Sequence, residues 1–522
     1  MGAPATHCDF YARWRAENEA RLFLGERDAA YPPERLLQSI WLHQRLRRED
    51  LQTLDGQPLR VLHPGFWNHA AGPDFHGAVL QFGQEAARAG DVEVDRVPGN
   101  WQAHGHEGNP AFAGVILHVI WDGSRPGAHP IPSLALEKFL DTPLAEIQQW
   151  GGGGAAREWP EALQGACSAP LAGLAPEKTA ELLQQAARVR FERKAREMEA
   201  RARQAGWEQA LWEGLFRALG YKQNIWPMQR MGELLPRLQT PSAPCEARQA
   251  APEGGRAVPA LNSLVTACQA RLLGVAGLLP LDVSRNPQST IRNPQSGGVA
   301  SLLPPDLSGS APDQYLRKLW DHWWRERESF SDAILPRNLW RFGGLRPANQ
   351  PQRRLALAAH WLSTNDFLPR LERWFTEDRP AAALAASLLA CLQAPEDDFW
   401  SWHWGLRSAR LARPQPLLGA TRVTDLAVNV ILPWFWARAR AGRNEPLRKL
   451  AEARFGAWPA AQDNALLRLA RRRMLGGPGS KSARSAAAQQ GLLQIVHDFC
   501  DHSNAICADC HFPELVRGFV VG

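Results

Sequence analysis

The chain has few cysteines, few lysines and no long hydrophobic run. Eight cysteines among 522 residues are too few for a disulfide framework, which excludes the disulfide-rich scaffolds of small secreted proteins. No segment approaches the roughly 18 uninterrupted apolar residues of a membrane-spanning helix. The stretch from Met1 to Glu19 is polar and lacks the apolar core of a secretory signal. We therefore expect a cytoplasmic protein that has no membrane partner.

The charge balance is mildly basic and depends almost entirely on arginine. Lys and Arg together number 60 against 53 Asp and Glu, which gives a net charge of +7, and only seven of the 60 are lysines. This charge permits nucleic acid as a partner without requiring it. Arg346, Arg353 and Arg354 flank a proline-containing loop, where they either contact phosphate or lie at a solvated turn and the start of a helix.

The composition is otherwise typical of a globular protein with a core. Hydrophobic residues make up 45% and charged residues 22%, which excludes collagen and disorder throughout the chain. Tryptophan is unusually frequent, with 22 residues against four tyrosines. We expect many of these tryptophans in the cores between helices.

The first 150 residues predict a small α/β domain. Pro32 and Pro33 precede an amphipathic helix whose apolar residues recur at helical spacing up to Leu46. Strand-like runs follow at 59–63, 78–82, 91–94 and 114–121. The second and third runs are typical of a hairpin, and the last is nearly all apolar, so we expect it to be buried on both faces.

Beyond residue 150 the pattern is mostly helical, so the whole chain is predicted to be an α+β protein. The expected parts are a helical segment at 166–240, a linker rich in Pro, Gly and Ser at 241–314, a helical domain at 315–475, and a C-terminal helix with a cysteine cluster at 486–522. Within the linker, 281–310 lacks apolar periodicity and contains the sequence RNPQS twice, at Arg285 and at Arg292. We expect this insertion to be disordered.

Three acidic residues in the first domain are the best candidates for a metal site. Asp74 comes just before one strand of the predicted hairpin and Glu93 lies on the other, so antiparallel pairing would bring them to neighbouring strands. Glu93 and Asp95 share one face, because side chains along a strand alternate with a period of two. Paired carboxylates are the ligands that Mg²⁺ or Mn²⁺ requires. The sequence therefore predicts a divalent ion held by Asp74 and Glu93.

Three of the histidines that follow these acids in the same domain bear on the site. His104 and His106 lie two residues apart in a predicted loop, where they can chelate one ion, position a phosphate or act as a base. If the loop is merely solvated, neither has such a role. His118 lies inside an apolar strand, where a hydrogen-bonded core histidine is commoner than a metal ligand.

The order of these elements and acids resembles the restriction-endonuclease-like nucleases of the PD-(D/E)xK superfamily. That core consists of a helix, three strands, a helix and a fourth strand, with Pro-Asp at the second strand and acid-x-Lys at the third. Pro73 and Asp74 match the first motif, the run at 93–95 occupies the second, and Glu34 matches an optional further acid. Asp95 replaces the lysine, and the connection that follows is too short for a full second helix. The resemblance implies a metal-dependent nuclease fold and activity.

The C-terminus carries three closely spaced cysteines. Cys500, Cys507 and Cys510 follow a C-x6-C-x2-C spacing, and a CxxC turn with a third thiolate can hold zinc. An iron–sulfur cluster is the second option, since some nucleases complete a C-terminal cysteine triplet with one upstream cysteine. The candidates for the fourth ligand are His502, His511 and a distant cysteine such as Cys8. Three reduced cysteines that pack a terminal helix are an equal alternative.

Motifs along nearly the whole chain carry a second resemblance. They comprise the runs at 62–68, 72–75, 90–93, 115–119 and 207–224, Trp101 with His104 and His106, 346–349, Asn429 with Leu432 and Pro433, and the cysteine triplet. By these motifs the chain is identified as a member of a bacterial family, domain of unknown function family 2851. This resemblance implies relatedness and no particular activity.

Two functions of different classes follow from the sequence. The first is a metal-dependent phosphodiesterase or nuclease acting on nucleic acid, in which His104 or His106 assists in place of the missing lysine. The second is a non-enzymatic helical scaffold or binding protein with a structural metal site. Convergence of Asp74, Glu93 and the two histidines would favour the enzyme, and their dispersal over the surface would favour the scaffold.

Overall fold

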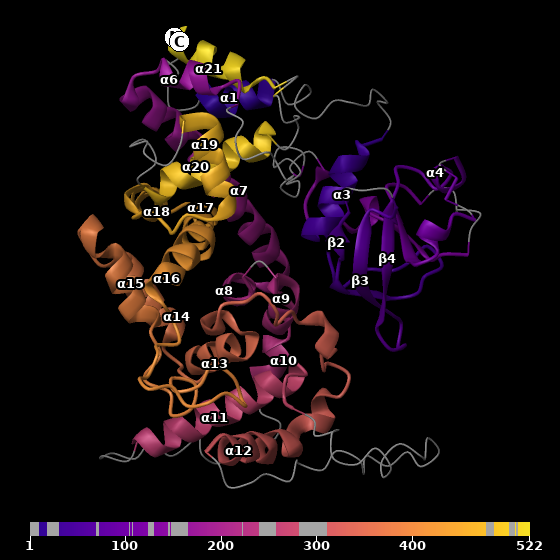
Figure 1. The fold of residues 1–522 in the computed structure, drawn as a ribbon, viewed down its shortest axis with the longest axis vertical. Helices are drawn as coiled ribbons and strands as arrows, with labels where there is room; N and C mark the ends of the chain where they lie inside the picture. Colours follow the sequence, from indigo (N-terminus) through magenta and orange to yellow (C-terminus); the bar gives the residue numbers. More distant parts are fainter. Residues whose placement is uncertain are drawn as a thin grey trace. The chain divides into compact units, whose positions relative to one another are not determined.

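The protein is an α+β molecule, in which the first part of the chain forms a sheet and the rest is mostly helical (Figure 1). Its internal contacts divide the chain into two units. The computed structural model describes residues 10–17, 31–68, 72–103, 105–106, 108–123, 130–144, 147, 165–221, 223–239, 257–280, 311–476, 485–500, 507 and 510–521. Unit 1 comprises Met1–Ala210, Pro380–Ala385 and Thr424–Gly522, and unit 2 comprises Leu211–Arg379 and Ala386–Val423. The units therefore do not follow the linear order of the chain.

Unit 1 contains a mixed sheet formed by the first part of the chain. Helix α3 (Glu34–His43) precedes strands β1 (Leu59–His63), β2 (Phe66–Trp67), β3 (Phe75–Phe82), β4 (Arg88–Val94), β5 (Val115–Ile120) and β6 (Ser133–Ala135). The order across the sheet is β1-β3-β4-β5-β6, and β2 pairs with β3. The helix and the four predicted strands are all present, while β2 and β6 are additional.

Strand β4 pairs with its two neighbours in opposite senses. It runs antiparallel to β3, with Phe75 facing Val92, and parallel to β5, with Glu93 beside His118. A parallel pair requires a crossover connection. Here the described part of the crossover contains only α4 (Asn100–Ala103) and a 3-10 turn (Pro110–Phe112). The expectation that a full second helix does not fit is confirmed.

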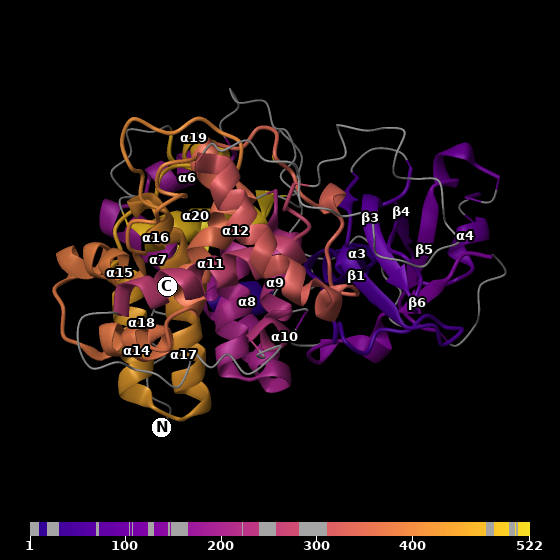
Figure 2. The same ribbon diagram turned by 90° about the horizontal axis from the view of Figure 1, so that it is seen from below.

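Helix α3 packs its apolar face against the sheet (Figure 2). Pro33 precedes the helix directly, and Leu37, Ile40 and Trp41 are fully buried in the core that the helix shares with the strands. Trp41 Nε1 also donates a hydrogen bond of 2.9 Å to the carbonyl of Pro64. Helix and sheet are thus fixed to each other by both packing and a buried hydrogen bond.

The rest of unit 1 is a group of helices around the long helix α7. These are α1 (Phe10–Glu17), α6 (Ser168–Ala172), α7 (Pro176–Ala205), α17 (Leu432–Ala441), α18 (Glu445–Ala457), α19 (Ala465–Leu475), α20 (Ala486–Asp498) and α21 (Phe512–Val521). Helix α7 packs against α20 and α17. Gly206, with a φ of 87°, ends α7 before α8 (Trp207–Leu219) begins, so the predicted helical segment contains separate helices.

Unit 2 is helical in its described part. It contains, wholly or in part, α8, α9 (Ile225–Glu233), α10 (Leu235–Gln239), α11 (Ala257–Val275), α12 (Ala311–Glu326), α13 (Pro351–Leu362), α14 (Phe367–Thr376), α15 (Leu384–Leu392) and α16 (Ala420–Leu426). Helix α11 lies inside the segment 241–314, which the sequence predicts to be a linker. The prediction fails for this helix because its Pro- and Gly-rich flanks dominate the composition of the segment. The insertion predicted at 281–310 lies outside the described residues.

The two longest helices differ in character, and neither is a membrane span. Helix α7 has 30 residues and carries charged side chains along its length, whereas α11 has 19 residues and is more apolar. Within the described part of the chain, no helix is both long enough and apolar enough to cross a bilayer.

A buried ionic network joins α1 to α20 within unit 1. The carboxylate of Asp498 is 1% exposed and accepts hydrogen bonds from Tyr11 Oη at 2.8 Å and from Arg15 Nε at 3.3 Å. Gln494 Nε2 donates to the same carboxylate at 2.8 Å. Because a buried carboxylate is stable only when it is paired, this network ties the first described helix to the C-terminal part of the chain.

The contact between α7 and α20 depends on a glycine, and this generates a prediction. A Cβ added at Gly491 on α20 would lie 2.1 Å from the backbone oxygen of Leu183 on α7. We expect Gly491→Ala to destabilise the protein by about 1–3 kcal/mol, because the two backbones must move apart. The control is Gly456→Ala on α18, where a Cβ meets nothing within 4 Å and should stabilise by roughly 0.5–1 kcal/mol. Urea unfolding followed by tryptophan fluorescence measures both, and a wild-type midpoint for Gly491→Ala would contradict the close contact.

Candidate functional site

Asp74 and Glu93 meet because β3 and β4 are antiparallel. Phe75 faces Val92 across the pair, so Asp74, one residue earlier, stands opposite Glu93. The amide of Asp74 donates a hydrogen bond of 3.0 Å to Glu93 Oε2, and the amide of Val94 donates one of 3.1 Å to Asp74 Oδ2. The prediction that strand pairing brings these two acids together is confirmed.

Asp95 follows directly after β4 and is bound to a histidine of β5. Its Oδ2 lies 3.0 Å from His118 Nε2, and the two side chains are 1% and 0% exposed. His118 stands beside Glu93 because β4 and β5 are parallel. His118 is therefore the hydrogen-bonded core histidine that its position in an apolar strand predicts, and Asp95 is held in one orientation.

His106 joins these acids from the connection between β4 and β5. Its amide donates a hydrogen bond of 3.1 Å to the carbonyl of Trp101, and its ring stacks on Phe112 with the ring centroids 3.9 Å apart. These contacts hold the imidazole so that Nε2 lies 3.2 Å from Glu93 Oε1. His104, the other histidine of the predicted pair, lies outside the described residues.

Glu93, Asp95 and His106 form a group with the geometry for a metal ion. One ligand atom from each residue lies within 4.8 Å of the other two, and no other such group occurs among the described residues. Two carboxylate oxygens and one imidazole nitrogen suit Mn²⁺ better than Mg²⁺, which prefers oxygen ligands alone. Asp74, expected as a ligand with Glu93, is a direct neighbour of this group. We call these four residues the acid–histidine cluster.

The acids of the cluster are crowded and poorly solvated. Burial and then the negative charge of Asp74 raise the pKa of Glu93 to about 9. Burial raises the pKa of Asp74 to about 6, although hydrogen bonds from Gln38 and from the Val94 amide oppose the rise. Without a cation, Glu93 therefore keeps its proton at neutral pH. A bound cation would favour the ionised form of both acids.

Gln38 on α3 links the helix to the cluster, and the sequence pattern alone does not single it out. Its Nε2 donates hydrogen bonds to Asp74 Oδ1 at 2.9 Å and to Glu34 Oε1 at 3.2 Å. Glu34 and Gln38 are four residues apart and so share one helix face, which is the signal that could have identified Gln38. The further acid suggested by the nuclease resemblance thus lies next to the cluster.

The C-terminal cysteines also lie in unit 1. Cys500, Cys507 and Cys510 are free and partly exposed. The amide of Cys510 donates a hydrogen bond of 3.3 Å to the carbonyl of Cys507, which brings the two ends of the CxxC motif together. Arg473 Nη2 donates a hydrogen bond of 2.9 Å to Cys507 Sγ.

Of the predicted candidates for a fourth ligand, His511 lies within the described residues. His511 Nδ1 lies 3.3 Å from Glu514 Oε2, so this histidine already has a carboxylate partner. Cys8 and His502 lie outside the described residues.

Arg353 and Arg354 have structural roles in unit 2. They are 0% and 3% exposed. Arg353 Nη2 donates a hydrogen bond of 2.7 Å to the carbonyl of Gln415, and Arg354 Nη1 donates one of 2.8 Å to that of Leu417. Neither guanidinium faces solvent, where a phosphate could reach it.

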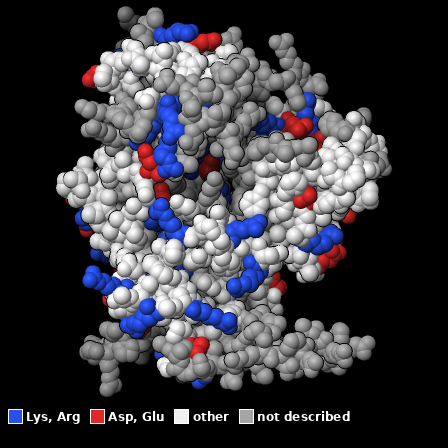
Figure 3. Space-filling model, in the orientation of Figure 1, with Lys and Arg blue, Asp and Glu red and all other residues white. Residues whose placement is uncertain are grey.

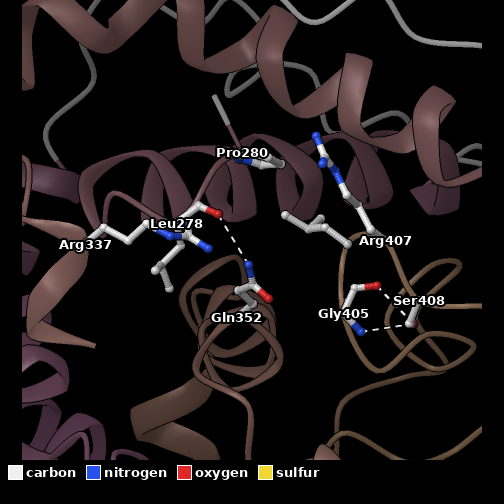
Figure 4. A pocket seen from close by; sticks show the side chains of 8 residues that line it. Leu278, Pro280, Arg337, Gln352, Gly405, Arg407 and Ser408 are labelled. Carbon is white, nitrogen blue, oxygen red and sulfur yellow. Dashed lines mark hydrogen bonds between the residues drawn. The ribbon is translucent and has the colours of Figure 1, made fainter. Parts of the chain in front are cut away.

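A pocket of about 300 Å³ in unit 2 has few side chains that could take part in a reaction (Figure 4). Gln352 lies between Arg337 and Arg407 in this view and donates a hydrogen bond of 3.3 Å to the carbonyl of Leu278. Ser408 bonds locally to Gly405. The described residues that line the pocket include no acid, histidine or cysteine, so the acid–histidine cluster remains the stronger candidate for a reaction.

Comparison with known proteins matches the chain to a family model. The family model described as "Protein of unknown function (DUF2851)" matches residues 34–250 and 256–454. No curated protein and no solved structure matches the chain. The matched residues include the sheet, the acid–histidine cluster and most of the helices, and they end before the cysteine triplet. The chain therefore belongs to the DUF2851 family of proteins of unknown function.

Proposed function

We propose that the sheet-bearing domain is a divalent-metal-dependent phosphodiesterase that acts on nucleic acid. The observation that carries the proposal is the convergence of Asp74, Glu93, Asp95 and His106 from β3, β4 and the crossover connection. Perturbed acids that gather beside a histidine are typical of functional sites. The order of helix, three main strands, short crossover and parallel fourth strand, which resembles the core of restriction-endonuclease-like nucleases, also supports the proposal.

Glu93, Asp95 and His106 would hold the ion, because their donor atoms are already gathered. A bound divalent ion would polarise the phosphate and lower the pKa of a nearby water. His118 fixes the orientation of Asp95 through its buried hydrogen bond, as outer partners of metal ligands commonly do.

We assign the role of proton acceptor to Asp74. It is more exposed than Glu93 and Asp95, and its pKa of about 6 lies close to neutral pH, where a general base is most effective. Gln38 holds one of its oxygens by a hydrogen bond. When the water oxygen attacks phosphorus, Asp74 takes the proton, the bond to the leaving oxygen breaks, and that oxygen takes a proton from solvent.

A purely structural role explains the acid–histidine cluster less well than metal binding does. Carboxylates that are buried side by side destabilise a fold unless a cation or proton compensates them. The described neighbours of Glu93 supply an imidazole and an amide rather than a guanidinium or an ammonium group. In a scaffold Glu93 would stay protonated, whereas a bound cation would stabilise the ionised form of the acids in the cluster.

Basic side chains lie in several groups on the face drawn in Figure 3, and acidic side chains lie beside some of them. Exposed basic side chains of this kind can contact the phosphates of a nucleic acid.

Metal binding should depend on pH in a defined direction. The pKa of Glu93 is raised above its ordinary value to about 9, so the metal-free protein carries a proton that the ion must displace. We expect the Mn²⁺ affinity of the full chain to rise as pH increases from 6 to 9, with release of roughly one proton per ion. Calorimetry in buffers of different ionisation enthalpy measures both quantities. An affinity that is constant over this range would contradict the raised pKa or the site.

Variants should separate ion binding from proton transfer. We expect Glu93→Gln to weaken Mn²⁺ binding by at least the 10–100-fold that loss of an outer partner costs, and to abolish cleavage of labelled DNA and RNA strands. Asp74→Asn should retain Mn²⁺ binding within a few-fold while cleavage falls by about 10²-fold or more.

The matched control for these variants is Asp91→Asn. Asp91 is on the same strand, where it pairs with His76 at 3.1 Å, outside the cluster. It should match the wild type in both binding and cleavage. Wild-type protein that binds Mn²⁺ and cleaves none of these strands would refute the phosphodiesterase, and equal cleavage by all three variants would place the activity elsewhere.

A further inference from the structure

A cysteine remote in sequence from the C-terminal triplet lies in the same core of unit 1 as two members of that triplet. Cys167 lies directly before α6 and is 5% exposed within a hydrophobic core formed by α1, α6, α7, α19, α20 and α21. Cys500 and Cys510 pack against this same core. The sequence suggests a distant cysteine as a further ligand but does not single out Cys167, because this residue is more than 300 residues from the triplet and has no cysteine near it.

Arg473 on α19 connects the segment of Cys167 to the triplet. Its carbonyl accepts a hydrogen bond of 2.9 Å from the amide of Gly165, and its Nη2 donates one of 2.9 Å to Cys507 Sγ. A Cβ added at Gly165 would lie 3.1 Å from the Arg473 carbonyl oxygen and 3.3 Å from Cys167 Sγ. The segment of Gly165 and Cys167 therefore packs closely against Arg473, the residue that contacts Cys507 of the triplet.

The pKa values of two of these thiols depend on the neighbouring cysteines. Burial, and then the charges of Cys510 and Cys507, raise the pKa of Cys167 to about 12, and Arg473 opposes the rise. Burial, and then the charges of Cys167 and Cys510, likewise raise the pKa of Cys500. The charge of Cys167 thus influences the Cys500 thiol, and Arg473 opposes the rise in the pKa of both.

We propose that Cys167, Cys500, Cys507 and Cys510 form a four-thiolate metal site, with Cys167 as the fourth ligand. A single tetrahedral zinc with Zn–S bonds of about 2.3 Å would bring its sulfurs to about 3.8 Å of one another. Among the described residues, no three of these sulfurs come within 4.8 Å of each other. A cluster with several iron atoms holds its thiolates farther apart, so an iron–sulfur cluster is the occupant that fits.

The test uses the full chain, expressed with ample iron and purified without oxygen or chelator. We expect roughly two or four irons per chain with as many acid-labile sulfides, and a broad absorption near 400 nm. Cys167→Ala and Cys500→Ala should each lose at least nine-tenths of the iron and sulfide. Cys391→Ala, which changes a partly buried cysteine outside the core, is the control and should keep both. Circular dichroism establishes that each variant is folded.

X-ray absorption at the metal edge of the wild type tests the ligands without any variant. A shell that contains only sulfur is expected, and nitrogen or oxygen in the shell would overturn Cys167 as the fourth ligand. Full iron and sulfide in Cys167→Ala, or less than a tenth of an equivalent of any metal in the wild type, would overturn the site. One zinc per chain in place of iron and sulfide would overturn the cluster.

Discussion

The pairing of β4 with two neighbours in opposite senses determines where the polar residues of the sheet-bearing domain meet. Antiparallel pairing with β3 brings Asp74 opposite Glu93, and parallel pairing with β5 brings His118 to Asp95. The parallel pair also requires a crossover, and the short one used here carries His106 back to Glu93. A register shift of one residue in either pair would turn these side chains to the other face.

The resulting crowding of acids connects the fold to the proposed chemistry. Glu93 and Asp95 are nearly inaccessible to water, so their charge is poorly solvated, and the pKa of Glu93 rises accordingly. A cation at this site would compensate the buried acids, since buried charge requires a partner. The C-terminal core differs, because there the packing of several helices brings Cys167 to Arg473, which contacts Cys507 of the triplet.

Local pattern predicted the parts of the structure that depend on neighbours in sequence. Strand β1 has the predicted bounds, and the adjacency of Asp74 and Glu93 follows from a hairpin with a period of two. Residues that act through distant contacts were missed. Gln38 reaches Asp74 from another element, and Cys167 reaches the triplet only through the packing of several helices. Helix α11 was missed for a different reason, since the composition of its flanks concealed its apolar residues.

The central claim is that Glu93, Asp95 and His106 hold a divalent ion. Anomalous diffraction tests it most directly, on crystals of the full chain grown with Mn²⁺ and measured on both sides of the manganese absorption edge. The account predicts a peak within about 2.0–2.4 Å of a carboxylate oxygen of Glu93, a carboxylate oxygen of Asp95 and a ring nitrogen of His106. Crystals that show manganese only elsewhere, or none at all at millimolar Mn²⁺ and pH 8, would contradict it.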